Sequence, residues 1–229
     1  DQIRTTVCYN VLNVKLAGAH AGLSVGRDGA THQALEDVAI MRTLPNMTVI
    51  VPCDALETER AALAAAAVEG PCFIRFGREA VPVITNEKSS FKIGKARLVS
   101  GHDAADARYD SDCVIFANGP LVHEAQMAAA DLADEDIHVT VYDLHTVKPL
   151  DKDTVIAAAE KAGHVVTAEE HQKAGGMGSA VAECLAENCP VPMRMIAVDD
   201  SFGESGSPDE LYDKYGLRAS NIKAAVKSM

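Results

Sequence analysis

The segment from residue 18 to residue 33 concentrates the residue types that could do chemistry. It reads GAHAGLSVGRDGATHQ and holds four glycines, two histidines (His20 and His32) and one aspartate (Asp28) within sixteen residues. Imidazole and carboxylate groups donate, accept and orient hydrogen bonds to hydroxyls, and glycines let a backbone approach a ligand closely. The segment therefore predicts a site for a hydroxylated or anionic small molecule. Its spacing matches neither the dinucleotide-binding G-x-G-x-x-G pattern nor a P-loop.

The elements around this segment must place it at the edge of a sheet. Short apolar runs predict strands at 11–17, 47–51 and 72–76, and helical periodicity predicts helices at 33–44 and 54–69. This β-α-β-α-β order is typical of a parallel sheet covered by helices. Because ligands bind at the carboxyl ends of such strands, the 18–33 segment lies where a site is expected, beside a helix N-terminus that favours anionic oxygens.

The second half of the chain repeats the alternation after an interruption. Residues 81–110 are rich in Gly, Pro, Ser and charges and read as a linker, with a short strand at 96–99. Strands are then predicted at 113–117, 137–144, 164–168 and 193–198, with helices between them. The sequence Ser207-Pro-Asp-Glu predicts a capped helix that ends at Gly216. We therefore expect an α/β domain at 1–80, a linker at 81–110 and an α/β domain at 111–229.

The two domains differ in how complete they look. The second has the strands and helices of a whole α/β unit, whereas the first holds three predicted strands, fewer than open α/β sheets usually have. We expect the first domain to be the C-terminal part of a larger one, completed by residues that this sequence lacks.

The composition of the chain argues against nucleic-acid binding and against a membrane span. The chain has 21 Lys+Arg against 33 Asp+Glu, a net charge of −12, and no Trp. Such a surface repels phosphate backbones and offers few aromatic platforms, so we expect no nucleic-acid partner. No apolar run is long enough to predict a membrane span, and the first residues do not resemble a signal peptide. The expected location is the cytoplasm, with its six scattered cysteines reduced.

Several segments resemble transketolases of the thiamine-diphosphate-dependent superfamily. Residues 20–37 (HAGLSVGRDGATHQALED) resemble the pyrimidine-binding-domain signature, and 42–47 (RTLPNM) resemble the family's R-x-x-P-N-M turn. Residues 76–78 (FGR) are similar to the strand end with a phosphate-binding arginine, and 202–206 and 214–217 resemble the C-terminal domain. The resemblance covers nearly the whole chain and is closest to the split type, whose C-terminal section is a separate subunit. It implies an incomplete pyrimidine-binding-type parallel sheet followed by a complete transketolase C-terminal-like α/β domain.

The resemblance also implies roles for four residues. His20 and Arg78 would contact the phosphate end or hydroxyls of a sugar phosphate, and Asp28 would contact a hydroxyl near the reacting carbon. His32 would face the donor carbonyl and the cofactor's aminopyrimidine, so His20 and His32 are the catalytic candidates. Without the resemblance, two of these residues also have a purely structural interpretation. Asp28 before Gly29 fits an ordinary turn, and Arg78 before Glu79 fits a weak surface ion pair.

The implied activity is transfer of a two-carbon ketol unit between sugar phosphates, as in the pentose phosphate pathway. The cofactor would be thiamine diphosphate with a divalent metal, in the complete enzyme only; no metal ligand is expected in this chain. The expected partners are sugar-phosphate substrates and the N-terminal transketolase portion, in a homodimer or heterotetramer. Alone, the chain is expected to be inactive.

Two alternatives stay open. Within the superfamily, the chain could belong to a 1-deoxyxylulose-5-phosphate synthase or to the β subunit of a 2-oxoacid dehydrogenase, which differ from a transketolase in their donor. Outside it, the chain could be a non-catalytic assembly module that keeps the fold.

Overall fold

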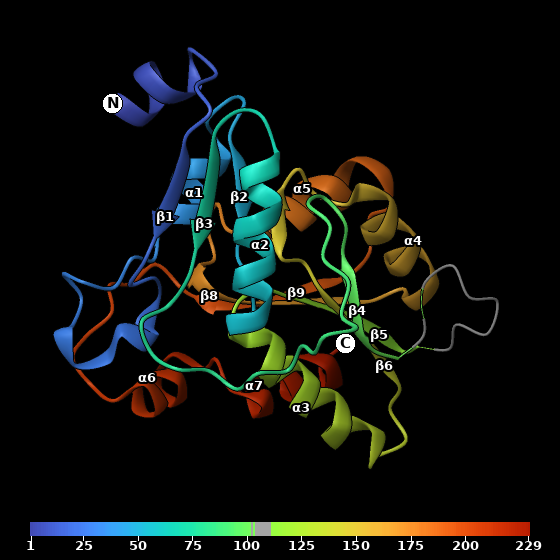
Figure 1. Cartoon of the computed structure of the whole chain (residues 1–229). Coiled ribbons are helices and arrows are strands. Elements are labelled where there is room, and N and C mark those ends of the chain that lie inside the picture. Colours follow the sequence, from blue (N-terminus) through green and yellow to red (C-terminus); the bar gives the residue numbers. More distant parts are fainter. Residues whose placement is uncertain (102, 104–110) are drawn as a thin grey trace.

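The protein contains two sheets of mainly parallel strands, seen in the computed structural model in Figure 1. The structure describes residues 1–101, 103 and 111–229. In the first sheet the strand order is β1-β3-β2-β7, with β1, β3 and β2 parallel and β7 antiparallel to β2. These strands are β1 (Lys15–Gly18), β2 (Thr48–Ile50), β3 (Cys72–Arg75) and β7 (Thr146–Lys148). The helical segments of this half are η1 (Ile3–Cys8), η2 (Leu23–Asp28), α1 (Asp37–Arg42) and α2 (Ala55–Ala67).

The second sheet has the strand order β4-β6-β5-β8-β9, and β4 is its antiparallel edge strand. Its strands are β4 (Arg97–Ser100), β5 (Cys113–Ala117), β6 (Val139–Asp143), β8 (Val165–Gln172) and β9 (Met193–Val198). The helices of this half are α3 (Leu121–Ala133), α4 (Lys152–Ala162), α5 (Met177–Asn188), α6 (Pro208–Tyr215) and α7 (Ala219–Lys227). Helices therefore cover both faces of a central parallel sheet, and the predicted α/β fold class is confirmed.

Local sequence explains how several helices begin and end. The Asp54 carboxylate accepts a hydrogen bond from the Glu57 backbone N–H at 2.9 Å and so caps α2. Ser207 and Glu210 form the predicted capping box at α6, and Gly216 adopts the left-handed conformation that ends this helix. Each cap satisfies backbone groups that the helix itself leaves without partners.

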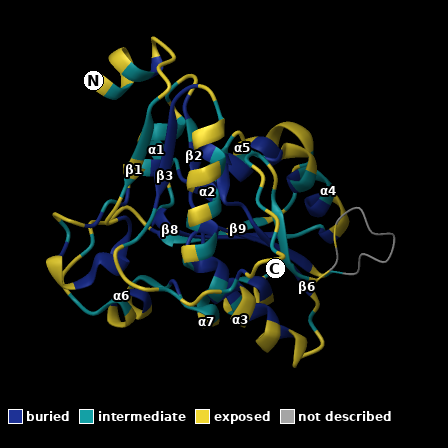
Figure 2. Ribbon diagram, in the orientation of Figure 1, coloured by how far each residue is buried: buried dark blue, intermediate teal, exposed yellow. Residues whose placement is uncertain are grey.

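One hydrophobic core joins the two sheets. Val49 and Phe73 of the first sheet pack in the same cluster as Tyr142 of β6 and Val181 of α5. A second cluster fills the opposite face of the second sheet, under α3 and α7. Figure 2 shows these strands and inner helix faces as buried, while the first helix and many loops are exposed. The two halves are therefore packed together as one body.

The structure differs from the predicted elements in three places. β7 follows directly after β6 and adds a fourth strand to the first sheet, so the second half of the chain completes that sheet's edge. β8 continues to Gln172, four residues beyond the predicted strand end. α1 begins at Asp37 rather than near residue 33, because residues 33–36 continue the loop.

The segment expected to be a linker is fastened to both halves where it is described. Asp54 accepts hydrogen bonds from the backbone N–H groups of Ile84 and Thr85 at 2.8 and 2.7 Å. Asp151 accepts from Lys95 Nζ and from the Ala96 backbone, both at 2.9 Å. β4 then forms close to the predicted short strand. The remainder of the expected linker, residue 102 and residues 104–110, lies outside the described part of the chain, and the domain boundaries stay a prediction.

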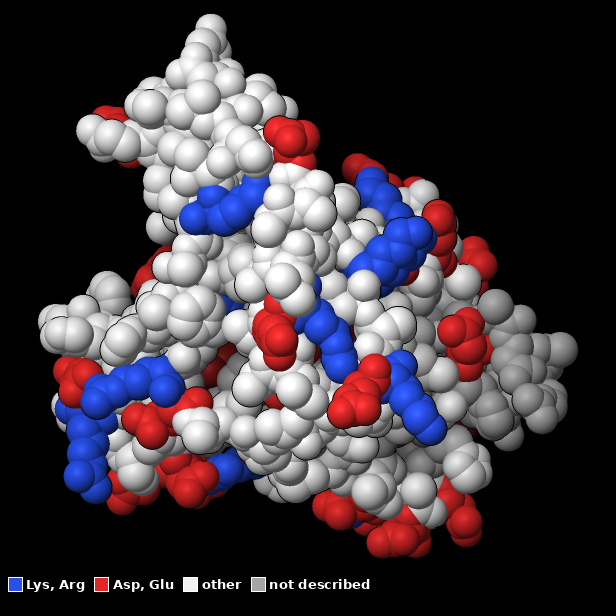
Figure 3. Space-filling view, viewed as in Figure 1, with Lys and Arg blue, Asp and Glu red and all other residues white. Residues whose placement is uncertain are grey.

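Charges of both signs lie next to each other on the face shown in Figure 3, without a continuous basic stripe there. All six cysteine thiols are free, and five of them are buried. In the described part of the chain, every helix is too short or too polar to cross a bilayer.

Candidate active site

The loop between β1 and α1 carries the sequence-predicted site residues and is held at both ends. The Ala21 backbone N–H donates to the Phe76 carbonyl at 3.3 Å, and the Gly22 N–H donates to the Ala34 carbonyl at 2.8 Å. His20, directly before these bonds, has a φ of 59°, in the left-handed region that few residues other than glycine adopt. The neighbouring backbone hydrogen bonds of Ala21 and Gly22 hold this conformation.

The structure brings Asp28 and Arg78 together. Arg78 Nη1 forms an ion pair with the Asp28 carboxylate, and its Nε lies 3.8 Å from Glu79. Gly77, two residues after β3 and directly before Arg78, lies against Ser24 of the loop. A hypothetical Cβ at Gly77 would lie 3.3 Å from Ser24 Oγ. Two of the four residues that the resemblance assigns to substrate therefore meet across 50 positions of sequence.

The two histidines belong to the same loop but not to this ion pair. His32 Nδ1 is hydrogen-bonded to Thr31 Oγ1 at 3.0 Å, and the His32 N–H donates to the Gly29 carbonyl at 2.9 Å. Among the hydrogen bonds of the described chain, neither imidazole contacts Asp28 or Arg78. All four side chains are exposed. The structure therefore brings Asp28 and Arg78 into contact, and it places the two exposed histidines on the same loop without a hydrogen bond to that pair among the described residues.

The side of the loop that faces the protein interior is buried and is hydrogen-bonded to the second half of the chain. The Gln33 amide donates to the carbonyls of Leu23 and Gly26, both at 3.2 Å, and to the Glu204 carbonyl at 3.0 Å. Glu204 belongs to the 202–206 segment, whose Gly203 lies so close to Gln33 that a Cβ there would be 1.9 Å from Oε1. Two segments far apart in sequence therefore fix each other's shape.

A buried arginine joins the loop's end to β8. Arg75 Nε lies 2.9 and 3.0 Å from the two oxygens of Asp37, at the start of α1. Its Nη2 donates to the carbonyls of Ala34 at 3.0 Å and Glu170 at 2.9 Å. Neither Arg75 nor Asp37 is among the site residues that the sequence predicts. The one local signal was a charged residue at the end of an otherwise apolar strand.

Glu169, Glu170 and His171 are buried strand residues rather than loop residues. Glu169 accepts hydrogen bonds from the Met177 and Gly178 N–H groups at 2.7 and 2.8 Å, at the start of α5. Burial nevertheless raises the pKa of Glu169 to about 7. Burial also lowers the pKa of His171 to about 4, with Arg75 adding to the effect. His171 therefore stays neutral and accepts the Ala39 N–H at 3.3 Å.

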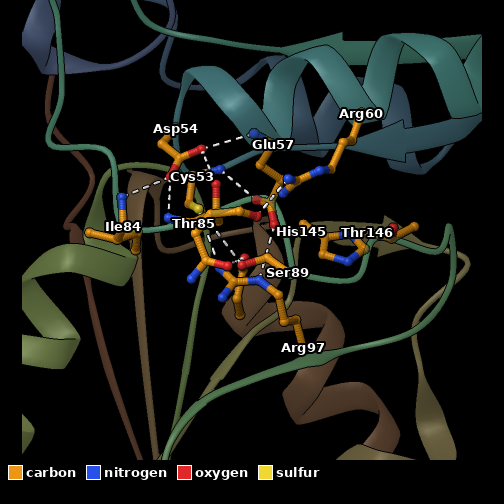
Figure 4. A network of polar contacts seen from close by, with 12 residues as sticks. Cys53, Asp54, Glu57, Arg60, Ile84, Thr85, Ser89, Arg97, His145 and Thr146 are labelled. Carbon is orange, nitrogen blue, oxygen red and sulfur yellow. Dashed lines mark hydrogen bonds and ion pairs between the residues drawn. The ribbon is translucent and has the colours of Figure 1, made fainter.

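A second buried network links α2 to the second sheet (Figure 4). Arg97 lies 3.2 Å from Glu57, 2.8 Å from Asp143 and 3.4 Å from Cys53 Sγ. Oxygen or sulfur atoms of Cys53, Glu57 and Asp143 also lie within 4.8 Å of one another, which is close enough for a shared metal ion. The Arg97 guanidinium already supplies the positive charge there, and burial holds the pKa of the Cys53 thiol far above its usual value. We therefore interpret this network as a structural contact between the two halves.

Known proteins match both halves of the chain. Residues 1–83 match the family model of the transketolase pyrimidine-binding domain, and residues 103–222 match that of the transketolase C-terminal domain. A 6-deoxy-6-sulfo-D-fructose transketolase subunit from Clostridium sp. (strain MSTE9) is 44% identical, with 99% of this chain and 68% of the relative covered. Transketolase-like protein 2 of Mus musculus is 40% identical, and the match covers 99% of this chain but 35% of that protein.

A solved structure of a split-gene transketolase, described as an inactive β4 tetramer, is similar in both sequence and shape. It is 43% identical with a TM-score of 0.89, and the match covers 99% of this chain and 70% of that chain. The chain therefore matches split-type relatives over about two thirds of their length and the mouse protein over about one third. From the two domain matches and these relatives, we conclude that the chain belongs to the transketolase family and contains its pyrimidine-binding and C-terminal domains.

Proposed function

We propose that this chain contributes one wall of a thiamine-diphosphate site and, with an N-terminal transketolase portion, transfers a two-carbon ketol unit between sugar phosphates. The observation that carries the proposal is the exposed Asp28–Arg78 ion pair on the loop that also holds His20 and His32. An oxyanion is stabilised strongly only where water is excluded. Exposed site residues therefore need a second surface that excludes water, which explains why the chain alone should be inactive.

Arg78 and Asp28 are suited to bind the sugar. A guanidinium binds two oxygens of a phosphate through parallel N–H bonds. Asp28 neutralises Arg78 until substrate arrives, and its second oxygen accepts a hydrogen bond from a sugar hydroxyl. An anionic substrate group must therefore share Arg78 with Asp28. This favours sugars that carry both a phosphate and a hydroxyl over simple anions.

His32 and His20 are suited to move protons and stabilise charge. The His32 Nδ1 bond to Thr31 orients the ring and leaves Nε2 for a carbonyl or alkoxide oxygen. Cleavage beside a ketone develops negative charge on that oxygen, which an imidazole N–H stabilises. His20, beside the strand end that carries Arg78, would bind the anionic or hydroxyl part of the sugar.

The site residues of this chain are suited to the side of the cofactor that faces the substrate. Thiamine diphosphate, when bound, supplies the electron sink for the carbanion formed beside the ketone. His32 is the residue here that would contact it. Within the described residues, Cys53, Glu57 and Asp143 lie close enough together to hold a metal, but Arg97 already supplies a positive charge to the two carboxylates. We therefore assign the diphosphate and its divalent metal to the N-terminal portion.

The test is reconstitution. The chain is assayed alone and with the N-terminal transketolase portion, thiamine diphosphate and Mg²⁺, using xylulose 5-phosphate and an aldose phosphate acceptor. We expect no turnover by the chain alone and ketol transfer by the mixture. Turnover by the isolated chain would contradict the proposal, as would a preference for pyruvate or a branched 2-oxoacid as donor, which would point to the synthase or dehydrogenase alternative.

A sulfonated donor is a second candidate, because the Clostridium relative is named for a sulfosugar. A sulfonate offers Arg78 the same planar pair of oxygens with one negative charge less than a phosphate. The same assay with 6-deoxy-6-sulfofructose distinguishes the two: the better donor is the one with the larger kcat/KM.

Replacing Arg78 by lysine should raise the KM for the phosphorylated donor roughly 10- to 100-fold, because a charged hydrogen bond contributes about 1.5–3 kcal/mol. The Arg78 and Asp28 side chains are 44% and 40% exposed, so the melting temperature should hardly change. Steady-state kinetics and thermal unfolding measure both. Glu79→Gln is the matched control, since it removes the other ionic neighbour of Arg78 and should leave KM unchanged. An unchanged KM in Arg78→Lys would contradict the assignment.

A further inference from the structure

We propose that Glu170, in the second half of the chain, is a positioning residue that holds the substrate-binding loop (residues 20–33) in its working shape. The proposal rests on the proposed function of that loop. It assigns to the C-terminal domain a direct part in forming the site, beyond packing against its neighbour.

The Glu170 carboxylate reaches the middle of the loop. It is 2% exposed, and its two oxygens accept hydrogen bonds from the Ser24 backbone N–H at 2.5 Å and the Ser24 hydroxyl at 3.2 Å. Ser24 lies midway between His20 and Asp28 in sequence. One contact, between residues 146 positions apart, therefore anchors the centre of the segment that carries the site residues.

The loop backbone is shaped around this carboxylate. Gly22 has a φ of +80°, and a Cβ there would lie 2.3–2.5 Å from the Glu170 carboxyl atoms. Only glycine allows the chain to pass so closely in that conformation. The site-bearing loop and Glu170 are thus complementary in shape as well as in hydrogen bonding.

Glu170 lies in a network of buried polar groups. Burial raises the pKa of Glu170, and the charge of Arg75, the Ser24 hydrogen bonds and Tyr212 of α6 partly oppose this rise. Arg75 also donates a hydrogen bond to the Glu170 carbonyl at 2.9 Å. A buried polar network with all partners satisfied fixes one arrangement more strictly than apolar packing does. The contacts of Glu170 therefore suit a residue that fixes the conformation of the loop.

The geometry that Glu170 sets matters for catalysis. Misplacing a reacting group by about 1 Å can lower a rate by 10²-fold. Asp28, four residues after Ser24 on the same loop, pairs with Arg78, so a shift of the loop at Ser24 should move Asp28 relative to Arg78. Loss of the Glu170 contact should then weaken substrate binding even though Glu170 does not touch substrate.

Glu169 provides the matched control. It is the neighbouring residue of β8, is also 2% exposed, and also accepts two hydrogen bonds, but its side chain holds the start of α5. Successive strand residues point to opposite faces. Glu169→Ala should therefore destabilise the chain about as much as Glu170→Ala without moving the loop.

The experiment has two readouts. In the reconstituted enzyme, Glu170→Ala is expected to raise the KM for the sugar phosphate at least tenfold, whereas Glu169→Ala leaves it within twofold. In the chain alone, backbone hydrogen exchange should accelerate at residues 22–33 in Glu170→Ala and at residues 176–180 in Glu169→Ala. Glu170→Gln keeps an oxygen that can accept the Ser24 N–H and should restore most of the KM.

Equal KM values for the two alanine variants, or unchanged exchange at residues 22–33 in Glu170→Ala, would overturn the proposal. If Glu170→Ala does not fold, Ser24→Ala replaces it in the test, because it removes only the hydroxyl from the same contact. Ser24→Ala should raise the KM two- to fivefold, and an unchanged KM would also overturn the proposal. Should the reconstituted wild type be inactive, the proposed function fails, while the exchange data still decide whether Glu170 holds the loop.

Discussion

Replacing His32 by alanine is expected to lower the kcat of ketol transfer in the reconstituted enzyme by about 10²- to 10⁴-fold, the range for removing a positioned acid–base group. The loss should appear in kcat more than in KM. His32 is assigned to the oxygen whose charge develops during bond cleavage, so its contribution arises mainly in the transition state.

The same substitution should leave folding almost unchanged. His32 is exposed, and its side chain has a single hydrogen bond, to the neighbouring Thr31. Surface substitutions of this kind usually change stability by less than about 0.5 kcal/mol. Circular dichroism and a thermal melt therefore separate a catalytic loss from unfolding.

His138→Ala is the matched control, because His138 is also exposed but lies in the second half of the chain at the start of β6. We expect it to keep full activity. If His32→Ala has the same kcat as His138→Ala, the chain is better explained as a non-catalytic assembly module that keeps the transketolase fold.

The largest effect on stability is expected at Arg97. Replacing Arg97 by leucine should destabilise the chain by about 3–5 kcal/mol at neutral pH, because it leaves buried carboxylates without their counter-charge. The carboxylates affected are Glu57, with 1% of its side chain exposed, and Asp143, with 0%. Urea unfolding monitored by circular dichroism measures the change.

This destabilisation should grow with pH. Burial, followed by the nearby charge of Glu57, raises the pKa of Asp143 well above its usual range, and Arg97 opposes both effects. A carboxyl whose pKa is higher in the folded state binds more protons there, so stability falls as pH rises above its ordinary pKa. Removing Arg97 raises the Asp143 pKa further, and the difference between variant and wild type should therefore be larger at pH 8 than at pH 5.

Two comparisons test the cause. Arg42→Leu also breaks an ion pair between the two halves, but its partner Glu183 is 65% exposed, so the loss should stay below about 1 kcal/mol. Adding Glu57→Gln and Asp143→Asn to Arg97→Leu should recover part of the stability and flatten its pH dependence. A pH-independent loss in Arg97→Leu would show that packing, rather than charge, explains its effect.

Much of the fold could be predicted from local sequence. Apolar runs and helical periodicity depend on neighbouring residues, which is why the alternating strands and helices and the α6 capping box were found. The glycine- and histidine-rich loop was also visible, because its residue types and its place after a strand are local features. The short β7 was missed, since three residues carry too little pattern to mark a strand.

The partners of buried polar residues could not be predicted in the same way. Arg75 and Glu170 read in sequence as charges near strand ends, and Arg97 as a charge in a linker; each is a central member of a buried network. Their roles depend on residues many positions away, such as Ser24 for Glu170.

By itself, the sequence determined the α/β class, the family resemblance and which loop carries His20, Asp28 and His32. Only the tertiary structure decided that Asp28 pairs with Arg78, that residues of the C-terminal half hydrogen-bond to this loop, and that all four predicted site residues are exposed. The physical reason is that hydrophobic periodicity and capping act between near neighbours in the chain. Desolvation and charge pairing depend on which distant segments meet, and this is fixed only when the whole core packs.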